Sequence, residues 1–194
     1  LKGKPVAVCM FPGRTADSGA IATANYAARD LGVHAGMPIV FAKKKAPNAV
    51  FLPADMAYYE EVSERIREIL RENADRFEQV SRDEAYLDVT QKSGGSIIDG
   101  KRIGLEIKRK VFDEEKLTCS VGVGPNKLIA KMASGVNKPD GITVVSQLEV
   151  GQFLRARRIS DLHGIGEKTE QALSEKGIRT IVQLSQAPVS QLQE

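Results

Sequence analysis

The spacing of hydrophobic and polar positions changes several times along the chain, and each change predicts a new element. Short apolar runs rich in β-branched residues and bounded by Gly, Pro or Asp are typical of strands. Such runs occupy residues 5–10, 50–52, 77–80, 85–90, 117–123 and 142–145. The pattern therefore predicts short strands along most of the chain up to residue 145.

Amphipathic helices are predicted between these strands. The clearest lies between Asp55 and Phe77, where apolar residues recur every three or four positions and the residues between them are mostly charged. A second helix is indicated by the same spacing of Ile103, Ile107 and Val111. Further helices are predicted over the Ala-rich residues 19–31, over residues 126–132 and over residues 146–154.

The order of these elements predicts an α+β fold. Strands and helices alternate through residues 58–145, which indicates an antiparallel-rich sheet with two helices on one face. From Ser146 onward the pattern is helical only, with helices on both sides of a Gly-rich turn at residues 162–166. A separate helical unit is therefore predicted at the C-terminal end.

The composition places the chain among globular domains. It has 194 residues, of which 42% are hydrophobic and 27% charged, enough to bury a real core. No apolar run approaches the roughly 20 residues of a membrane span. The two cysteines, Cys9 and Cys119, form no metal-ligand pattern and indicate a reduced, cytoplasmic location. Nothing in the sequence requires more than a monomer.

The net charge of +3 is unevenly distributed. Residues 1–53 carry seven basic and two acidic side chains, residues 54–92 carry six and eleven, and residues 93–194 carry fifteen and twelve. An acidic middle between basic ends fits a metal-binding centre flanked by phosphate-binding segments. It fits equally well a single solvated acidic helix.

Two adjacent carboxylates, Asp83 and Glu84, are the first candidates for chemistry. Neighbouring negative charges are costly to hold together unless a cation lies near them. Mg²⁺ binds through one or two carboxylates plus substrate phosphates, and pairs of such ions serve phosphoryl transfer. Asp88, four residues further on, adds a third carboxylate. A solvated turn beside Arg82 is the alternative interpretation.

A set of three residues near the N-terminus could bind phosphate. Thr23, Tyr26 and Arg29 are spaced by three, which would place a hydroxyl, a phenol and a guanidinium on one face of the predicted helix. An ordinary amphipathic helix face is the alternative interpretation of this spacing.

Lysines further along the chain are additional candidates. Lys138, in the turn Asn-Lys-Pro-Asp-Gly, could reach a terminal phosphate as a point charge. Lys127 and Lys131 share a helix face and could do the same, or they could simply be solvated.

A Gly-x-Gly turn between helices is the last candidate. Gly164, Ile165 and Gly166 precede Glu167 and Lys168 in the run LHGIGEKTEQALSEKGI. Backbone N–H groups at such a turn can approach a phosphate closely at a helix N-terminus. A helix-hairpin-helix binds the DNA backbone in this way, without reading sequence. A helix-helix turn without a ligand is the alternative.

The run SRDEAYLDVT at residues 81–90 resembles the signature strand of the Y-family translesion DNA polymerases, of the DinB or DNA polymerase IV type. Four further blocks resemble that family in the same order: KGKPVAVC at 2–9, SGAIATANYAARDLGVHAGMP at 18–38, SVGVGPNKLIAKMAS at 120–134 and NKPDGITVV at 137–145. The resemblance covers nearly the whole chain, and the second block is similar to archaeal members.

The resemblance implies small α/β fingers over residues 1–55, a palm over residues 56–145 and part of a helical thumb over residues 146–194. It implies attack of a primer 3′-hydroxyl on the α-phosphate of a deoxynucleoside triphosphate. The implied site residues are Asp83 and Glu84 for two catalytic Mg²⁺ ions, Thr23, Tyr26, Arg29 and Lys138 for the incoming nucleotide, and Gly164, Ile165, Gly166 and Lys168 for primer–template DNA.

The same resemblance implies that a first palm strand, with a metal-binding Asp and an aromatic steric gate, lies before Leu1. It also implies that a little finger and a peptide for binding a sliding clamp lie beyond Glu194. We therefore expect these residues alone to extend a primer weakly or not at all.

Three residues depart from the family pattern, namely Arg82, Gly135 and His163. Arg82 favours an alternative, a non-catalytic DNA-binding scaffold with a relic palm. A nucleotide cyclase is a third interpretation, and the helix-hairpin-helix argues against it, because a cyclase has no need of duplex DNA.

Overall fold

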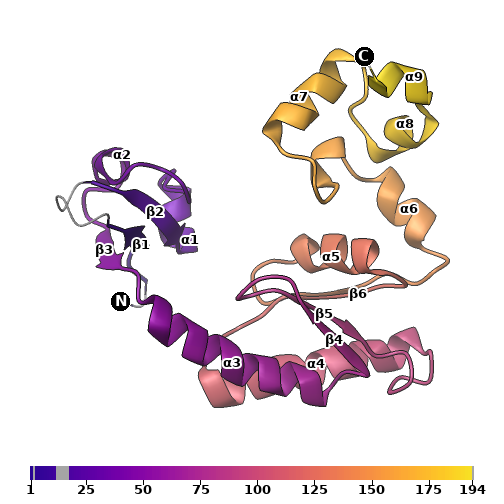
Figure 1. The fold of residues 1–194 in the computed structure, drawn as a ribbon, viewed down its shortest axis with the longest axis horizontal. Coiled ribbons are helices and arrows are strands. Elements are labelled where there is room, and N and C mark those ends of the chain that lie inside the picture. Colours follow the sequence, from indigo (N-terminus) through magenta and orange to yellow (C-terminus); the bar gives the residue numbers. More distant parts are fainter. Residues whose placement is uncertain (2, 12–17, 194) are drawn as a thin grey trace. The chain divides into compact units, whose positions relative to one another are not determined.

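The computed structural model describes residues 1, 3–11 and 18–193, which divide into two compact units. The first unit is Leu1–Glu60 and the second is Glu61–Glu194. The boundary falls inside the long helix α3 (Met56–Glu72; Figure 1). Among the described residues, no helix is long and apolar enough to cross a membrane.

The first unit is a three-stranded sheet with two short helices. Its strands pair in the order β2-β1-β3, with β1 antiparallel to β2 and parallel to β3. Small and β-branched side chains from the sheet and both helices form one buried core, which includes Ala7, Ile21 and Ile39. The elements are β1 (Val6–Met10), β2 (Ala20–Ala24), α1 (Tyr26–Asp30), α2 (Ile39–Lys45) and β3 (Val50–Pro53).

The prediction of a single helix over residues 19–31 is wrong. Residues 20–24 pair with β1 as strand β2, and only residues 26–30 form helix α1. Asn25 separates the two elements, because its side-chain oxygen accepts hydrogen bonds from the backbone N–H groups of Ala28 and Val6, each at 3.0 Å. The helix propensity of alanine is a weak preference. Strand pairing with β1 and the burial of Ile21 outweigh it.

The second unit begins with two long helices packed on a β-hairpin. Strands β4 and β5 are antiparallel, and both α3 and α4 share a hydrophobic cluster with Leu87 of β5. Two helices therefore cover one side of the hairpin, as the sequence pattern predicted. The elements of this region are β4 (Arg76–Gln79), β5 (Ala85–Asp88), α4 (Ile97–Glu115), β6 (Val121–Val123), α5 (Lys127–Val136) and β7 (Ile142–Val144).

Strands β6 and β7 form a separate parallel pair between two helices. A Cβ added at Gly104 of α4 would lie 3.1 Å from the side chain of Val121, whereas a Cβ at Gly122 of β6 would lie 1.9 Å from the carbonyl oxygen of Ala130 in α5. Neighbouring residues of a strand point to opposite faces. Helices α4 and α5 therefore cover opposite faces of this pair, and the sequence pattern predicted neither the parallel pairing nor the second covering helix.

The C-terminal part of the second unit is helical, as predicted. Helix α6 (Val150–Arg155) packs through Phe153 and Leu154 on the cluster that contains Ile129 of α5. A 3-10 turn then leads through the Gly-rich segment into three further helices. They are α7 (Glu167–Glu175), α8 (Ile181–Gln186) and α9 (Val189–Gln193).

Candidate active site

The tip of the β4–β5 hairpin carries Asp83 and Glu84, and several hydrogen bonds fix its shape. The backbone N–H groups of Val80 and Ser81 both donate to the carbonyl oxygen of Glu84, at 2.9 and 3.1 Å. The Ser81 hydroxyl donates to Asp83 Oδ1 at 2.8 Å. From α3, the buried Ser63 hydroxyl donates to the carbonyl oxygen at position 82. The two carboxylates are therefore presented by a tip that is restrained from within and from the helix.

A lysine compensates the charge of Glu84. The Lys131 ammonium, from α5, forms an ion pair with Glu84 Oε1. One turn earlier, Lys127 pairs with Glu78 of β4 and lies 5.5 Å from the centre of the Tyr86 ring. The basic face of α5 therefore lies along the acidic hairpin, so these two lysines are paired rather than simply solvated.

Asp83 and Glu84 are both accessible to a cation that is shared with a substrate phosphate. Asp83 is exposed and Glu84 is half-buried. Within the described ranges, no group of three or more His, Cys, Asp or Glu side chains could hold a metal by itself. A hard cation that takes one or two carboxylates and completes its shell with phosphate oxygens and waters needs no such group.

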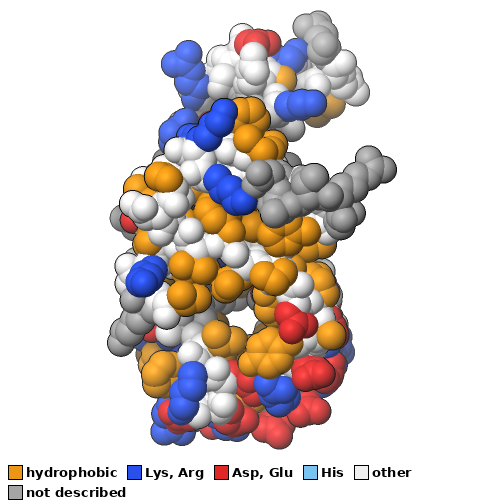
Figure 2. All heavy atoms as spheres, turned by 90° about the vertical axis from the view of Figure 1, so that its left-hand side faces the viewer, with side chains coloured by type: hydrophobic (Ala, Val, Ile, Leu, Met, Phe, Trp, Pro, Cys, Tyr) orange, Lys and Arg blue, Asp and Glu red, His pale blue; other side chains and the backbone are white. Residues whose placement is uncertain are grey.

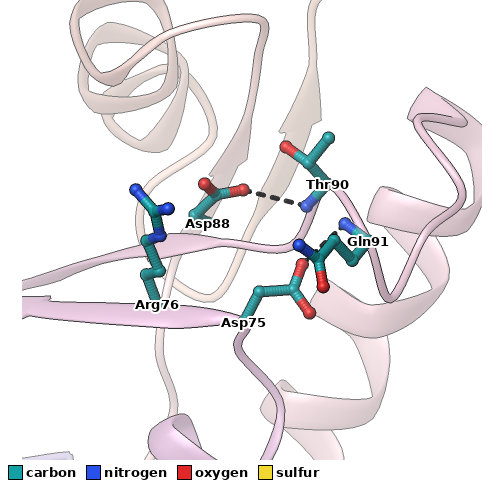
Figure 3. A pocket seen from close by; sticks show the side chains of 5 residues that line it. All are labelled: Asp75, Arg76, Asp88, Thr90 and Gln91. Carbon is teal, nitrogen blue, oxygen red and sulfur yellow. Dashed lines mark hydrogen bonds between the residues drawn. The ribbon is translucent and has the colours of Figure 1, made fainter.

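Asp88 does not join this pair of carboxylates. It lies at the other end of β5, four residues or about 13 Å along an extended strand from Glu84. There it lines a pocket with Asp75, Arg76, Thr90 and Gln91 (Figure 3). Its Oδ1 atom accepts the backbone N–H of Thr90 at 2.9 Å, and Asp75 Oδ2 accepts that of Gln91 at 2.7 Å. These carboxylates hold the loop after β5, which is a structural role.

This role predicts a pH-dependent contribution of Asp88 to stability. Hydrogen bonds from Thr90, and then the charge of Arg76, lower the pKa of Asp88 below its ordinary value. A lowered pKa stabilises the fold above the unfolded-state pKa, and this contribution is lost as the pH falls through the folded-state pKa. We expect Asp88→Asn to reduce the free energy of unfolding at pH 7 and to have almost no effect near pH 2, as measured by urea unfolding. An equal loss at both pH values would contradict this assignment.

Lys138 lies in the turn between α5 and β7. Its side chain is exposed and, among residues 1, 3–11 and 18–193, it forms no hydrogen bond or ion pair. The structure therefore leaves the ammonium free to bind an anion, but it does not bring Lys138 into the hydrogen-bond network of Asp83 and Glu84.

Thr23, Tyr26 and Arg29 come from two elements rather than one helix face. Thr23 is an exposed residue of β2, paired with Val8, whereas Tyr26 and Arg29 are on α1. The Arg29 guanidinium carbon lies 5.3 Å from the centre of the Tyr26 ring, and Arg29 Nε donates to the carbonyl oxygen of Ala24 at 2.8 Å. The arginine thus folds back toward the end of β2. The prediction that all three residues share one helix face is therefore wrong, and the structure shows a contact between Tyr26 and Arg29.

The Gly-rich turn before α7 leaves its backbone open. Gly164 has φ +95°, which favours glycine, and a Cβ at Gly164 or Gly166 would meet no atom of the described residues within 4 Å. Gly166 is the N-cap of α7 and has no side-chain cap. The first N–H groups of the helix can therefore face a phosphate. Figure 2 shows Lys and Arg side chains, together with acidic side-chain atoms, on the α7–α9 segment at the top of the view.

Sequence reasoning missed two residues of this site. Ser63 is a buried polar residue within a helix, and its packing against the hairpin tip is decided by tertiary structure. Lys131 was considered for phosphate binding or as a solvated residue, although the cost of two adjacent carboxylates already indicated that a cation was needed.

Comparison with known proteins identifies relatives over nearly the whole chain. A model of the impB/mucB/samB family matches residues 1–135. DNA polymerase IV of Nitrosopumilus maritimus is 51% identical over 184 residues, which cover 93% of this chain and 50% of the relative. DNA polymerase IV of Methanosarcina acetivorans is 48% identical over 198 aligned residues, which cover 99% of this chain and 54% of the relative.

Solved structures agree with these relatives. A Y-family DNA polymerase chimera has a TM-score of 0.94 at 43% identity and covers 98% of this chain and 56% of that chain. DinB from Sulfolobus solfataricus has a TM-score of 0.93 at 41% identity, with coverage of 98% and 55%. The insertion ternary complex of Dbh DNA polymerase has a TM-score of 0.93 at 43% identity, with coverage of 98% and 56%.

These matches define the class of protein to which the chain belongs. Its fold is that of the Y-family DNA polymerases. The chain belongs to the impB/mucB/samB family, and the recognition of the DNA polymerase IV type from the sequence is confirmed. Polymerases of this family generally use divalent metal ions. The chain spans about half the length of the curated relatives it matches.

Proposed function

We propose that the protein containing this chain is a template-directed DNA polymerase for lesion bypass. It would add deoxynucleotides to a primer 3′-hydroxyl by two-metal phosphoryl transfer. The observation that carries this proposal is the restrained hairpin tip that contains the consecutive residues Asp83 and Glu84, in a chain that belongs to the family. Paired carboxylates and a substrate phosphate are the ligand set that Mg²⁺ prefers.

The proposal divides the chain into fingers at residues 1–55, a palm at residues 56–145 and part of a thumb at residues 146–194. The end of the first compact unit at Glu60 supports the first of these boundaries. We further propose that the protein is a cytoplasmic monomer, and that a sliding clamp would recruit it through a segment outside this chain.

Each part of the proposed site has a separate task. Two Mg²⁺ ions, when bound, would stabilise the attacking and leaving oxygens. Asp83 and Glu84 would hold them, and the residues for the triphosphate would be Thr23, Tyr26, Arg29 and Lys138. Positioning and electrostatic stabilisation are sufficient, because phosphoryl transfer asks little covalent chemistry of the protein.

In this proposal, the helix-hairpin-helix binds the duplex DNA. The open backbone of Gly164, Ile165 and Gly166, with Lys168 in the first turn of α7, would bind phosphates of the duplex. Binding of this kind ignores sequence and weakens steeply with added salt, because each neutralised phosphate releases counterions.

A further prediction concerns the effect of the ion pair between Lys131 and Glu84 on primer extension. Lys131→Met in the full-length protein removes the ion-pair partner of Glu84, so the Glu84 side chain loses its orientation. A partly buried ion pair contributes about 1 kcal/mol, and we expect primer extension to fall about fivefold to tenfold in single-turnover assays. Lys131→Arg keeps the charge and should retain most of the rate. Equal losses in both variants would indicate a packing role instead.

Primer extension by the full-length protein with Mg²⁺ tests the proposal. We expect template-directed extension, together with duplex binding that weakens steeply with salt. Duplex binding without extension under any divalent metal would instead favour the non-catalytic scaffold. Absence of both would exclude both DNA-related functions. Strong extension by these 194 residues alone would contradict the expectation that a metal ligand lies outside them.

A further inference from the structure

Lys108, on α4, is a cation held almost out of solvent by the turn that contains Lys138. Its side chain is 15% exposed. The ammonium donates to the carbonyl oxygen of Cys119 at 2.6 Å, to the carbonyl oxygen of Asp140 at 2.8 Å, and to Asp140 Oδ1. A lysine has three N–H donors, so every donor of Lys108 is used.

The acceptors belong to two separate segments. Cys119 precedes β6, whereas Asp140 precedes β7, and these two strands pair with each other. Lys108 reaches both from a helix on one face of the pair. A cation in this position is costly to leave unpaired, so conformations in which Asp140 moves away are disfavoured.

The turn over residues 137–141 depends on this anchor. Asp140 has φ +59°, in the left-handed region that Asp and Asn tolerate better than most residues. Gly141 lies so close to the preceding backbone that a Cβ would be 2.0 Å from the carbonyl oxygen of Asn137. Besides the bonds from Lys108, the turn is held by the Asn137 amide, which donates to Thr143 Oγ1 at 3.0 Å. Lys138 extends from its middle, exposed and unpaired within the described ranges.

We propose that Lys108 is a positioning residue, which fixes the turn so that Lys138 is held ready for the phosphates of the incoming nucleotide. This inference rests on the nucleotide-binding role proposed above for Lys138. Lys108 itself would not touch the nucleotide, because its three donors are already taken. Its effect would therefore appear in nucleotide affinity and would pass through Lys138.

The test uses full-length protein and two readouts. The first is hydrogen exchange of the backbone amides in residues 137–142. The second is the dependence of single-turnover primer extension on deoxynucleotide concentration. The variants are Lys108→Met, Lys138→Met and their combination. Lys110→Met is the matched control, because Lys110 is on the same helix and forms a more exposed ion pair with Glu72 at 3.6 Å.

We expect Lys108→Met to speed exchange in the turn selectively. It should raise the half-saturating nucleotide concentration about tenfold, equivalent to about 1.4 kcal/mol, with a maximal rate within about twofold of the unmodified protein. In the Lys138→Met background, Lys108→Met should not raise the half-saturating nucleotide concentration any further. Lys110→Met should change neither the amide exchange of the turn nor the nucleotide dependence of extension. Asp140→Asn keeps the left-handed backbone and weakens the ion pair with Lys108. It should change the amide exchange and the half-saturating nucleotide concentration in the same direction by a smaller amount, and it replaces Lys108→Met as the test variant if that variant folds poorly.

Several outcomes would overturn this inference. One is an unchanged dependence of the extension rate on nucleotide concentration in both Lys108→Met and Asp140→Asn. Another is a double variant, Lys108→Met with Lys138→Met, in which the two single effects on the half-saturating concentration multiply. Faster exchange throughout residues 61–145 would show a general structural role. If Lys138→Met itself had no effect, the nucleotide role of Lys138 would be wrong. The exchange data would then show separately whether Lys108 holds the turn.

Discussion

Replacing Asp83 by Asn in the full-length protein should reduce primer extension at least about a thousandfold while duplex binding stays within about twofold. A thousandfold loss corresponds to about 4 kcal/mol of transition-state stabilisation, a size typical of removing one electrostatic partner from a phosphoryl-transfer site. Asp83 is exposed at the hairpin tip, and among the described residues its side chain bonds only within the tip, to Ser81. The amide can accept the same hydrogen bond, so the fold should be unaffected.

The matched control for this experiment is Asp88→Asn on the same hairpin. Asp88 is also an exposed carboxylate, but it lies at the far end of β5 and holds a loop. We expect this variant to extend primers at the unmodified rate below its unfolding temperature. Extension by Asp83→Asn at a comparable rate would contradict the metal assignment. A parallel loss of duplex binding would place Asp83 in the DNA interface instead.

Replacing Gly122 by Ala should destabilise the second unit by about 3 kcal/mol. The added Cβ would lie 1.9 Å from the carbonyl oxygen of Ala130 and 2.5 Å from the backbone nitrogen of Ser134. Both neighbours are backbone atoms of α5, so no side chain can move aside to make room. The helix must separate from β6, and Lys131 moves with it.

Urea unfolding measures this effect, and Gly135→Ala is its matched control. Gly135 is an exposed residue of the same helix, and a Cβ there would meet no atom within 4 Å in the part of the chain that the structure describes. Alanine is a better helix former than glycine, so this control should raise the free energy of unfolding by about 0.5–1 kcal/mol. A small effect at Gly122 would show that α5 does not pack directly on the strand.

The sequence alone determined the features that depend on local periodicity. The long helices α3 and α4 follow from apolar residues at helical spacing, and the hairpin that carries Asp83 and Glu84 follows from two short β-rich runs around a polar turn. The Gly-rich turn before α7 was equally readable, because a positive φ at Gly164 needs glycine.

Tertiary structure decided what local preference left open. The Ala-rich residues 20–24 have strong helix propensity, yet they form a strand because β1 offers a pairing partner and a place to bury Ile21. Asp88 looked like a third carboxylate of the site, but the extended strand places it at the opposite end of the hairpin.

The partners of the charged groups also came only from the fold. The residues joined in these contacts are far apart along the chain: Lys131 to Glu84, Ser63 to the backbone at position 82, and Lys108 to Asp140. Residue types and their local spacing are properties of the sequence, and they identified the chemistry. Contacts across 19 to 47 residues arise when helices pack on strands, and they determine how that chemistry is held in place.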